Sequence, residues 1–128
     1  MKLSEAISLG AMATEHVTHA FIIINEDGSI VTCAIGSALY AVGQHLRWSA
    51  ERNYISMRWR WVVSNRAQCP GCGGHFNAMA AIMHLNDSHR WSRERIAFFV
   101  SMIEPQEQVL LEDQREEQSV SEYVEVVT

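Results

Sequence analysis

Apolar residues recur at helical spacing in three parts of the chain. They stand three or four positions apart in residues 4–12, 35–46 and 92–103, which predicts three amphipathic helices. A fourth stretch, residues 76–86, is apolar on nearly all sides and predicts a helix that is buried in the core.

Polar residues mark where some of these segments begin and turn. Ser4 and Ser92 each stand where a predicted helix starts and can cap it. In residues 19–33, two short apolar runs flank the sequence NEDG (25–28), whose Asp-Gly pair can supply the positive φ that a tight hairpin needs. The sequence therefore predicts a short β-hairpin after the first helix.

Residues 55–65 change to a period of two. Arg58 and Arg60 alternate with apolar side chains, which predicts a half-buried strand with an arginine face. This strand would lead directly into a Cys-X-X-Cys motif. Its predicted buried face comprises Met57, Trp59, Trp61 and Val63.

Composition and charge divide the chain into two parts. The 128 residues are 48% apolar and 20% charged, which is ordinary for a globular protein. Residues 104–128 carry eight acidic residues against one basic residue, a net charge of −7, whereas residues 1–103 have nine basic and seven acidic residues, a net charge of +2. We therefore expect one domain over residues 1–103 and an acidic, partly flexible tail over residues 104–128.

The same composition restricts location and partners. No apolar run approaches the roughly 20 residues that a membrane helix needs, and the N-terminus has no signal-peptide pattern, so we expect a cytoplasmic protein without a membrane partner. The near-neutral charge of residues 1–103 argues against strong non-specific DNA binding, although a local basic patch can still exist.

Four potential metal ligands follow the predicted strand. Cys69, Cys72, His84 and His89 have the spacing C-x2-C-x11-H-x4-H, which nearly matches that of zinc sites. A glycine after Cys72 allows a tight turn in which backbone amides can point at sulfur. Four protein ligands leave no position for water, so a Zn²⁺ ion here would be structural, and His75 is an alternative ligand.

Other interpretations of the cysteines stay open at this level. Cys69 and Cys72 could be a reduced, unligated pair, or a redox pair, although thioredoxin-like sites open a helix within a βαβ unit. The zinc finger of DNA-reading proteins is matched only in part, because the helix after the knuckle offers mainly alanine and methionine where base-reading side chains would stand. Cys33 is expected to pack as a small hydrophobic residue.

The segment "CPGCG…HLNDSHRWSRERIAFFV" resembles small zinc-finger-like proteins of phages and prophages. Their pattern is approximately Cys-Pro-x-Cys followed by His-Leu-Asn-Asp-x-His-x-Trp-Ser/Thr-x-Glu-x-Ile-Ala. The stretches "LSEAISLGAM" and "CAIGSALYAVG" are similar to the front half of such proteins, so the resemblance covers most of residues 1–103. It implies a phage origin and action in a bacterial cytoplasm, and it brings no particular activity.

These observations predict an α+β domain in which a short sheet and packed helices are stapled by a zinc knuckle. The predicted function is binding, because the sequence shows no nucleophile-base pair, phosphate loop or open metal site. Nucleic-acid-linked regulation is the first hypothesis, since residues 76–86 and 92–103 could form a helix-turn-helix and arginines lie among aromatic residues. The candidate nucleic-acid-binding residues are Arg58, Arg60, Arg90, Arg93 and Arg95.

A protein partner is the alternative. A compact zinc-stapled domain with an acidic tail suits an inhibitor or adaptor that binds a bacterial host protein or another phage protein, and a homo-oligomer is also possible. The two hypotheses differ in the surface that they need. Nucleic acid would require the candidate arginines to share one exposed face, whereas an apolar face would favour a protein partner or self-association.

Overall fold

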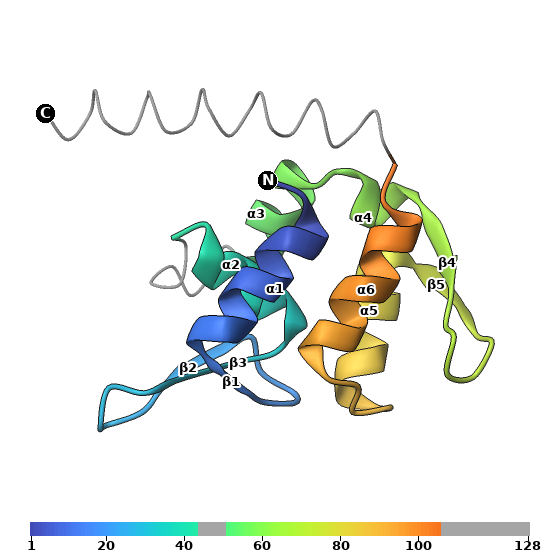
Figure 1. The fold of residues 1–128 in the computed structure, drawn as a ribbon. Coiled ribbons are helices and arrows are strands. Elements are labelled where there is room, and N and C mark those ends of the chain that lie inside the picture. Colours follow the sequence, from blue (N-terminus) through green and yellow to red (C-terminus); the bar gives the residue numbers. More distant parts are fainter. Residues whose placement is uncertain (44–50, 106–128) are drawn as a thin grey trace, which may run out of the picture.

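Six helices and two small sheets make up the part of the chain that the computed structural model describes, residues 1–43 and 51–105 (Figure 1). The order of elements is α1 (Leu3–Ala13), β1 (Glu15–His16), β2 (Ile22–Ile24), β3 (Ile30–Thr32), α2 (Ala34–Ala41), α3 (Glu51–Arg58), α4 (Trp61–Ser64), β4 (Arg66–Gln68), β5 (His75–Asn77), α5 (Ala78–Asp87) and α6 (Arg93–Ile103). The predicted α+β class is confirmed.

The core lies where α1, α2, α5 and α6 meet. Figure 1 shows α1 and α6 side by side, and α1 also packs on α2 while α5 packs on both α2 and α6. Gly10 allows the close approach of α1 to α2, because a Cβ atom there would stand 1.8 Å from the carbonyl oxygen of Ser37. The fully buried side chains of these helices include Leu3, Ile7, Ile35, Leu39, Ile82, Leu85, Ile96 and Val100.

The predicted hairpin is confirmed. Strands β2 and β3 pair antiparallel, and β1 adds to β3 in parallel to give the order β1-β3-β2. Gly28 in the turn has a φ of +86°, which is the positive value that the Asp-Gly pair was expected to supply.

The strand predicted over residues 55–65 is wrong, because this stretch forms α3 and α4. Ile55, Trp59 and Val62 are buried at helical spacing, whereas Met57 is 70% exposed. Trp59 and Trp61 are both buried, and the helix is interrupted between them, since α3 ends at Arg58 and α4 begins at Trp61. The strand that leads into the knuckle is β4, which pairs antiparallel with β5.

The helix ends follow the sequence prediction in part. Ser92 caps α6, with its Oγ accepting from the amide of Arg95. Ser4 does not cap α1, which begins at Leu3 after Lys2. Instead the amide and hydroxyl of Ser4 both donate to the carboxylate of Glu104, at 2.6 and 2.9 Å, so the residue after α6 is tied to the first turn of α1.

Two predicted features fall wholly or partly outside the described residues. The helix predicted over residues 35–46 begins as α2 and is described to residue 43, and Leu46 lies beyond that point. The acidic tail beyond Pro105 also lies outside the described part of the chain.

Candidate metal centre

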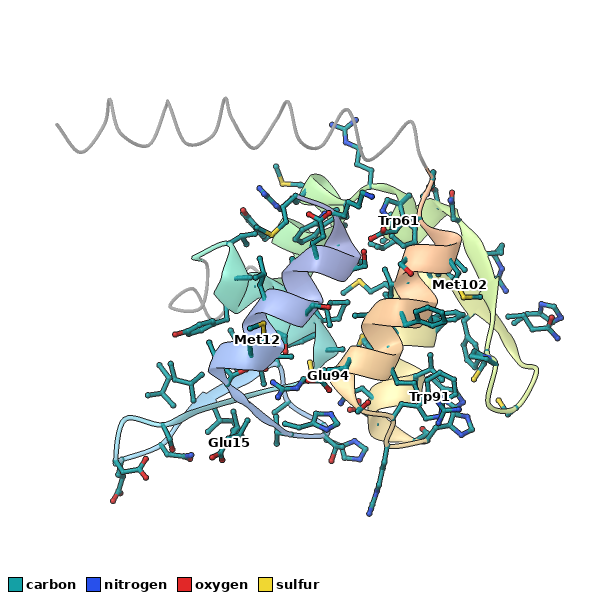
Figure 2. The ribbon with its side chains drawn as sticks, in the orientation of Figure 1. Met12, Glu15, Trp61, Trp91, Glu94 and Met102 are labelled. Carbon is teal, nitrogen blue, oxygen red and sulfur yellow. The ribbon has the colours of Figure 1, made fainter. Side chains whose placement is uncertain are left out.

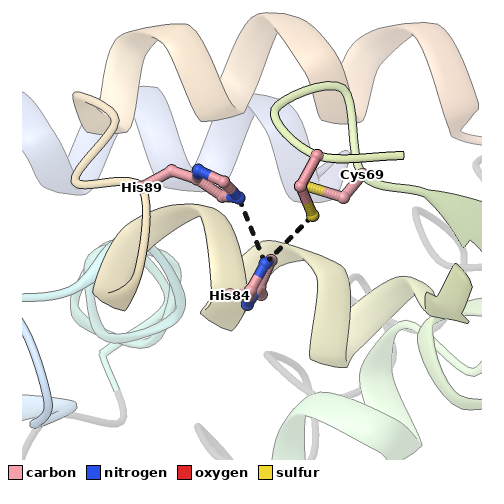
Figure 3. Close-up of side chains that lie close together, drawn as sticks. Cys69, His84 and His89 are labelled. Carbon is pink, nitrogen blue, oxygen red and sulfur yellow. Dashed lines mark hydrogen bonds between the residues drawn. The ribbon is translucent and has the colours of Figure 1, made fainter. Parts of the chain in front are cut away.

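Four side chains from three places in the fold converge on one point. Cys69 and Cys72 lie on the turn between β4 and β5, His84 lies on α5, and His89 follows the end of that helix. Their ligand atoms all lie within 4.8 Å of one another (Figure 3). The structure thus brings together all four predicted ligands in a group that could hold a metal ion.

Two separations between ligand atoms match a tetrahedral site. His84 Nε2 lies 3.1 Å from His89 Nε2 and 3.5 Å from Cys72 Sγ. Tetrahedral zinc, with bonds of about 2.0–2.1 Å to nitrogen and 2.3 Å to sulfur, implies edges of about 3.3 Å between two nitrogens and about 3.5 Å between nitrogen and sulfur. A ring nitrogen has one hydrogen or one lone pair, so a single protonation state of His84 does not explain both contacts as good hydrogen bonds.

The turn that carries the cysteines has the backbone of a metal knuckle. The amide of Cys69 donates to Gly74 O and the amide of Gly73 donates to Cys69 O, each at 2.8 Å. Gly73 has a φ of +77°, so the glycine after the second cysteine has the role that the sequence predicted. The amide of Gly71 points at Cys69 Sγ from 3.4 Å, as the amides of a metal knuckle point at sulfur.

Neighbouring residues hold the two imidazole rings. The ring of Phe76 lies against that of His84 with 4.8 Å between centroids. The backbone of the knuckle packs closely on the ring of His89 at Gly71. A Cβ atom there would lie 3.0 Å from the ring, so any other residue would force the ring or the backbone to move.

The remaining cysteine and histidine candidates lie outside this group. His75 is exposed on β5 and does not belong to the four-residue cluster found among the described residues. Cys33 is buried, as expected, and also caps α2, because its Sγ accepts from the amide of Gly36 at 3.3 Å. Burial raises the pKa of the Cys33 thiol to about 11, so it stays protonated near neutral pH.

The helix that follows the knuckle belongs to the core. Asn77 caps α5 by accepting from the amide of Ala80 at 2.8 Å. Ala78, Met79 and Ala81 in its first turns are buried. The helix therefore cannot enter a DNA groove as the reading helix of a classical zinc finger does.

Arg93 is not available to a nucleic acid. It is only 6% exposed, and its guanidinium donates to the hydroxyls of Thr14, Thr32 and Ser37 and to the carbonyls of Ala11 and Thr14. Burial lowers the pKa of this guanidinium from its ordinary value. A cation at the carboxyl end of α1 complements the helix dipole, so Arg93 stabilises the fold.

The other four candidate arginines do not all lie on one face. Arg58 ends α3 and Arg60 precedes α4, whereas Arg90 and Arg95 flank the start of α6. Figure 1 shows that the start of α6 and the α3–α4 region lie at opposite ends of α6. The guanidinium of Arg95 stacks on the ring of Trp91 at 3.6 Å from the centroid.

The face between α1 and α6 is apolar and hollowed. A groove of about 630 Å³ runs between the helices, with small residues at Ser4, Ser8, Ala97 and Ser101. Leu9 and Phe98 also line it, and Phe98 is 68% exposed. Glu5 and Glu94 line the same groove. Met12 on α1 and Met102 on α6 are exposed, and Figure 2 labels both of them together with Glu94.

Asn86 is a structural residue to which the sequence alone assigned no role beyond its place in the His-Leu-Asn-Asp segment. Its Oδ1 accepts from His16 Nε2 and from the amide of Ala34, while its Nδ2 donates to Val17 O and to Asp87 Oδ1. All four hydrogen-bonding positions of this buried amide are thereby used. The end of α5 is thus fixed to the start of α2 and to the segment after β1.

Comparisons with protein-family models, with curated proteins and with solved structures give no match to this chain. Among the described residues, no helix has the length and apolar character that crossing a membrane requires.

Proposed function

We propose that this chain is a non-catalytic zinc-binding protein whose Cys2His2 site stabilises a module that binds another protein. The convergence of Cys69, Cys72, His84 and His89 within 4.8 Å carries the metal part of this proposal. Two thiolates and two imidazoles favour Zn²⁺ over Mg²⁺ or Ca²⁺, which prefer oxygen ligands. Four protein ligands complete a tetrahedron, so the ion would have a structural role.

A bound ion would join the β4–β5 ribbon to α5. Strands β4 and β5 have three residues each, and a two-stranded ribbon of this size is marginal in water. Ligands on the β4–β5 turn and at the end of α5 would fasten the ribbon to the core helix. Metal binding is therefore expected to contribute directly to the free energy of folding.

Native mass spectrometry of the purified chain tests the metal site. Wild-type protein should carry one zinc ion, and Cys72→Ser and His84→Ala should lose both the ion and thermal stability. His75→Ala is the matched control, because His75 is exposed and outside the cluster. A wild-type chain that folds without metal, or a His75→Ala variant that loses zinc, would contradict the proposal.

The α1–α6 groove supports a protein partner over a nucleic acid. Its small residues let another helix approach closely, while Leu9 and Phe98 offer apolar contacts. Glu5 and Glu94 add negative charge to the same groove. The partner that fits is an amphipathic helix with apolar anchors and flanking lysine or arginine residues, whereas a second copy of this chain would bring like charges together.

Substitution in the groove tests this partner. Since the resemblance to phage proteins implies a bacterial host, the tagged chain would be incubated with bacterial extract and bound proteins identified. Phe98→Glu should abolish capture of the partner, while Met57→Glu, an exposed methionine on α3, should retain it. A peptide carrying the partner's basic amphipathic helix should then bind wild type more tightly than Phe98→Glu, and equal affinities would contradict this assignment.

Nucleic-acid binding is the second candidate, and the stacked pair of Arg95 and Trp91 favours it locally. Fluorescence anisotropy with single-stranded and duplex DNA at about 20 mM salt separates the two hypotheses, because phosphate contacts are strongest at low ionic strength. Salt-dependent binding that weakens in Arg95→Gln would support nucleic acid. No binding at low salt would leave the protein partner as the supported function.

A further inference from the structure

A cavity lies on the side of α5 that faces α2 and the β1–β2 segment. It has a volume of about 250 Å³ and is lined on its apolar side by Phe21, Ile35, Ile82 and Met83. An apolar cavity of about 150 Å³ accommodates benzene, so this space suits one ring with a short substituent. It is separate from the metal ligands, since none of the four lines it.

The polar end of the cavity carries an aspartate. Asp87 Oδ1 accepts from the amide of His19 and from Asn86 Nδ2, each at 2.9 Å. Asp87 Oδ2 lies 3.9 Å from His19 Nδ1, and no lysine or arginine of the described residues forms a salt bridge with this carboxylate. The carboxylate is thus held in place at the cavity without a permanent cationic partner.

The backbone at the mouth of the cavity is strained. His19 has a φ of +63°, a left-handed conformation that is unfavourable for a residue with a Cβ atom. The bond from its amide to Asp87 holds this conformation. Strain of this kind persists where the surrounding structure fixes it, and such positions cluster at ligand sites.

The other polar groups that line the cavity do not offer a competing site. Asn86 already makes four hydrogen bonds, so it has no position left for a ligand. The Cys33 thiol is protonated near neutral pH and its sulfur accepts from Gly36, so it is neither an anion nor an activated nucleophile. Recognition therefore depends on the Asp87 carboxylate and on apolar contact.

From this geometry we propose that the cavity binds a small organic cation, an amine carried on an apolar ring or chain of about six to eight heavy atoms. The ammonium group contacts Asp87 Oδ2 and the apolar part packs against Phe21 and Met83. A charge-assisted hydrogen bond to the carboxylate distinguishes this ligand class from neutral molecules of the same shape, and carboxylate-bearing molecules are repelled.

Titrations of the zinc-loaded, ¹⁵N-labelled protein, followed by amide chemical shifts, test the site. Benzylamine should shift the amides of Phe21, Ala34 and Met83 and bind about tenfold more tightly than benzyl alcohol, which corresponds to the gain from one charge-assisted hydrogen bond. Phenylacetate should not shift these amides. Equal binding of benzylamine and benzyl alcohol, or shifts confined to other surfaces, would overturn the proposal.

Two variants extend the test. Asp87→Asn keeps an oxygen that can accept from the His19 amide but removes the charge, so it should abolish the preference for benzylamine over benzyl alcohol. Glu26→Gln, which removes an exposed carboxylate in the turn between β2 and β3, should leave the preference unchanged. If Asp87→Asn does not fold, Met83→Trp tests the same site by filling the cavity, and benzylamine binding that survives in a folded Met83→Trp variant would contradict the proposal.

Discussion

Replacement of Arg93 by methionine should destabilise the fold by about 3 kcal/mol. The variant keeps a long side chain and a good helix former, but it removes the donors that reach Ala11 O and Thr14 O at 3.2 and 2.8 Å. Each buried carbonyl that loses its donor costs about 1–3 kcal/mol, whereas removal of a buried charge recovers part of this sum. Loss of the guanidinium costs less at the hydroxyls of Thr32 and Ser37, because these two hydroxyls also hydrogen-bond to each other.

Urea unfolding followed by tryptophan fluorescence would measure this loss, since Trp59 and Trp61 are both buried in the folded state. The midpoint should fall while the dependence on urea concentration stays the same, and the melting temperature should fall by about 12–24 °C for a domain of this size. Both proteins would be saturated with zinc, so that a difference in metal content does not contribute.

Arg95→Met is the matched control, because Arg95 is exposed two residues further along the same helix and its main contact is the ring of Trp91. Its loss should cost less than about 1 kcal/mol. If Arg93→Met also costs less than this, the buried network does not stabilise the fold. The inference that Arg93 is structural would then be refuted.

Three further predictions concern other buried or strained positions. Asn86→Ala should cost about 3 kcal/mol in urea unfolding, because four hydrogen bonds inside the fold are lost, and a cost below about 1 kcal/mol would contradict this role. Arg90→Gly should be neutral or stabilise by up to about 1 kcal/mol, since Arg90 has a φ of +53°, and clear destabilisation in thermal unfolding would refute the strain. Burial raises the pKa of Glu104, although Ser4 donates two hydrogen bonds to this carboxylate. The folded chain therefore holds the carboxyl proton of Glu104 more tightly than the unfolded chain does. The stability that this proton contributes is lost as pH rises through the folded pKa. The melting temperature of Glu104→Gln minus that of wild type should therefore increase between about pH 4 and about pH 7, and a constant or falling difference would contradict the raised pKa.

The candidate metal-ligand cluster was predictable from sequence because its constraint is local. A close cysteine pair and two histidines on and just after one helix have few ways to converge, so Cys69, Cys72, His84 and His89 were found from spacing alone. Helix α6 and the first hairpin were also predicted, since each combines an apolar pattern with a cap or turn signal. Helix α5 was predicted over residues 76–86 from its apolar character alone, and it is found at Ala78–Asp87.

Residues 55–65 show where periodicity is ambiguous. Alternation of apolar side chains and arginines fitted a strand, but spacings of four and three between Ile55, Trp59 and Val62 fit a helix equally well over so short a window. Trp61, which follows the break between α3 and α4, is buried as well. Such a break depends on packing against the rest of the domain, which a local pattern does not contain.

Arg93 shows a different limit, because a usable signal was present. It stands three, four and seven positions before Ile96, Ala97 and Val100, so it lies on the apolar face of α6. The signal was outweighed by the preference of arginine for the surface. Its partners lie 56 or more positions away in the chain, as does the Glu104 partner of Ser4, so neither contact could be foreseen from neighbouring residues.

The end of α5 connects the candidate zinc site to the cavity, so the two binding equilibria can be linked. Six residues, 84–89, contain two of the candidate metal ligands and, between them, the Asn86 and Asp87 that fix the start of α2 and the mouth of the cavity. If zinc changes the affinity of the cavity for an amine by some factor, the amine must change the affinity for zinc by the same factor. Competition with a chelator in the presence and absence of benzylamine would measure that coupling free energy. The zinc content of the chain would then report whether the cavity is occupied, although no metal ligand lines the cavity.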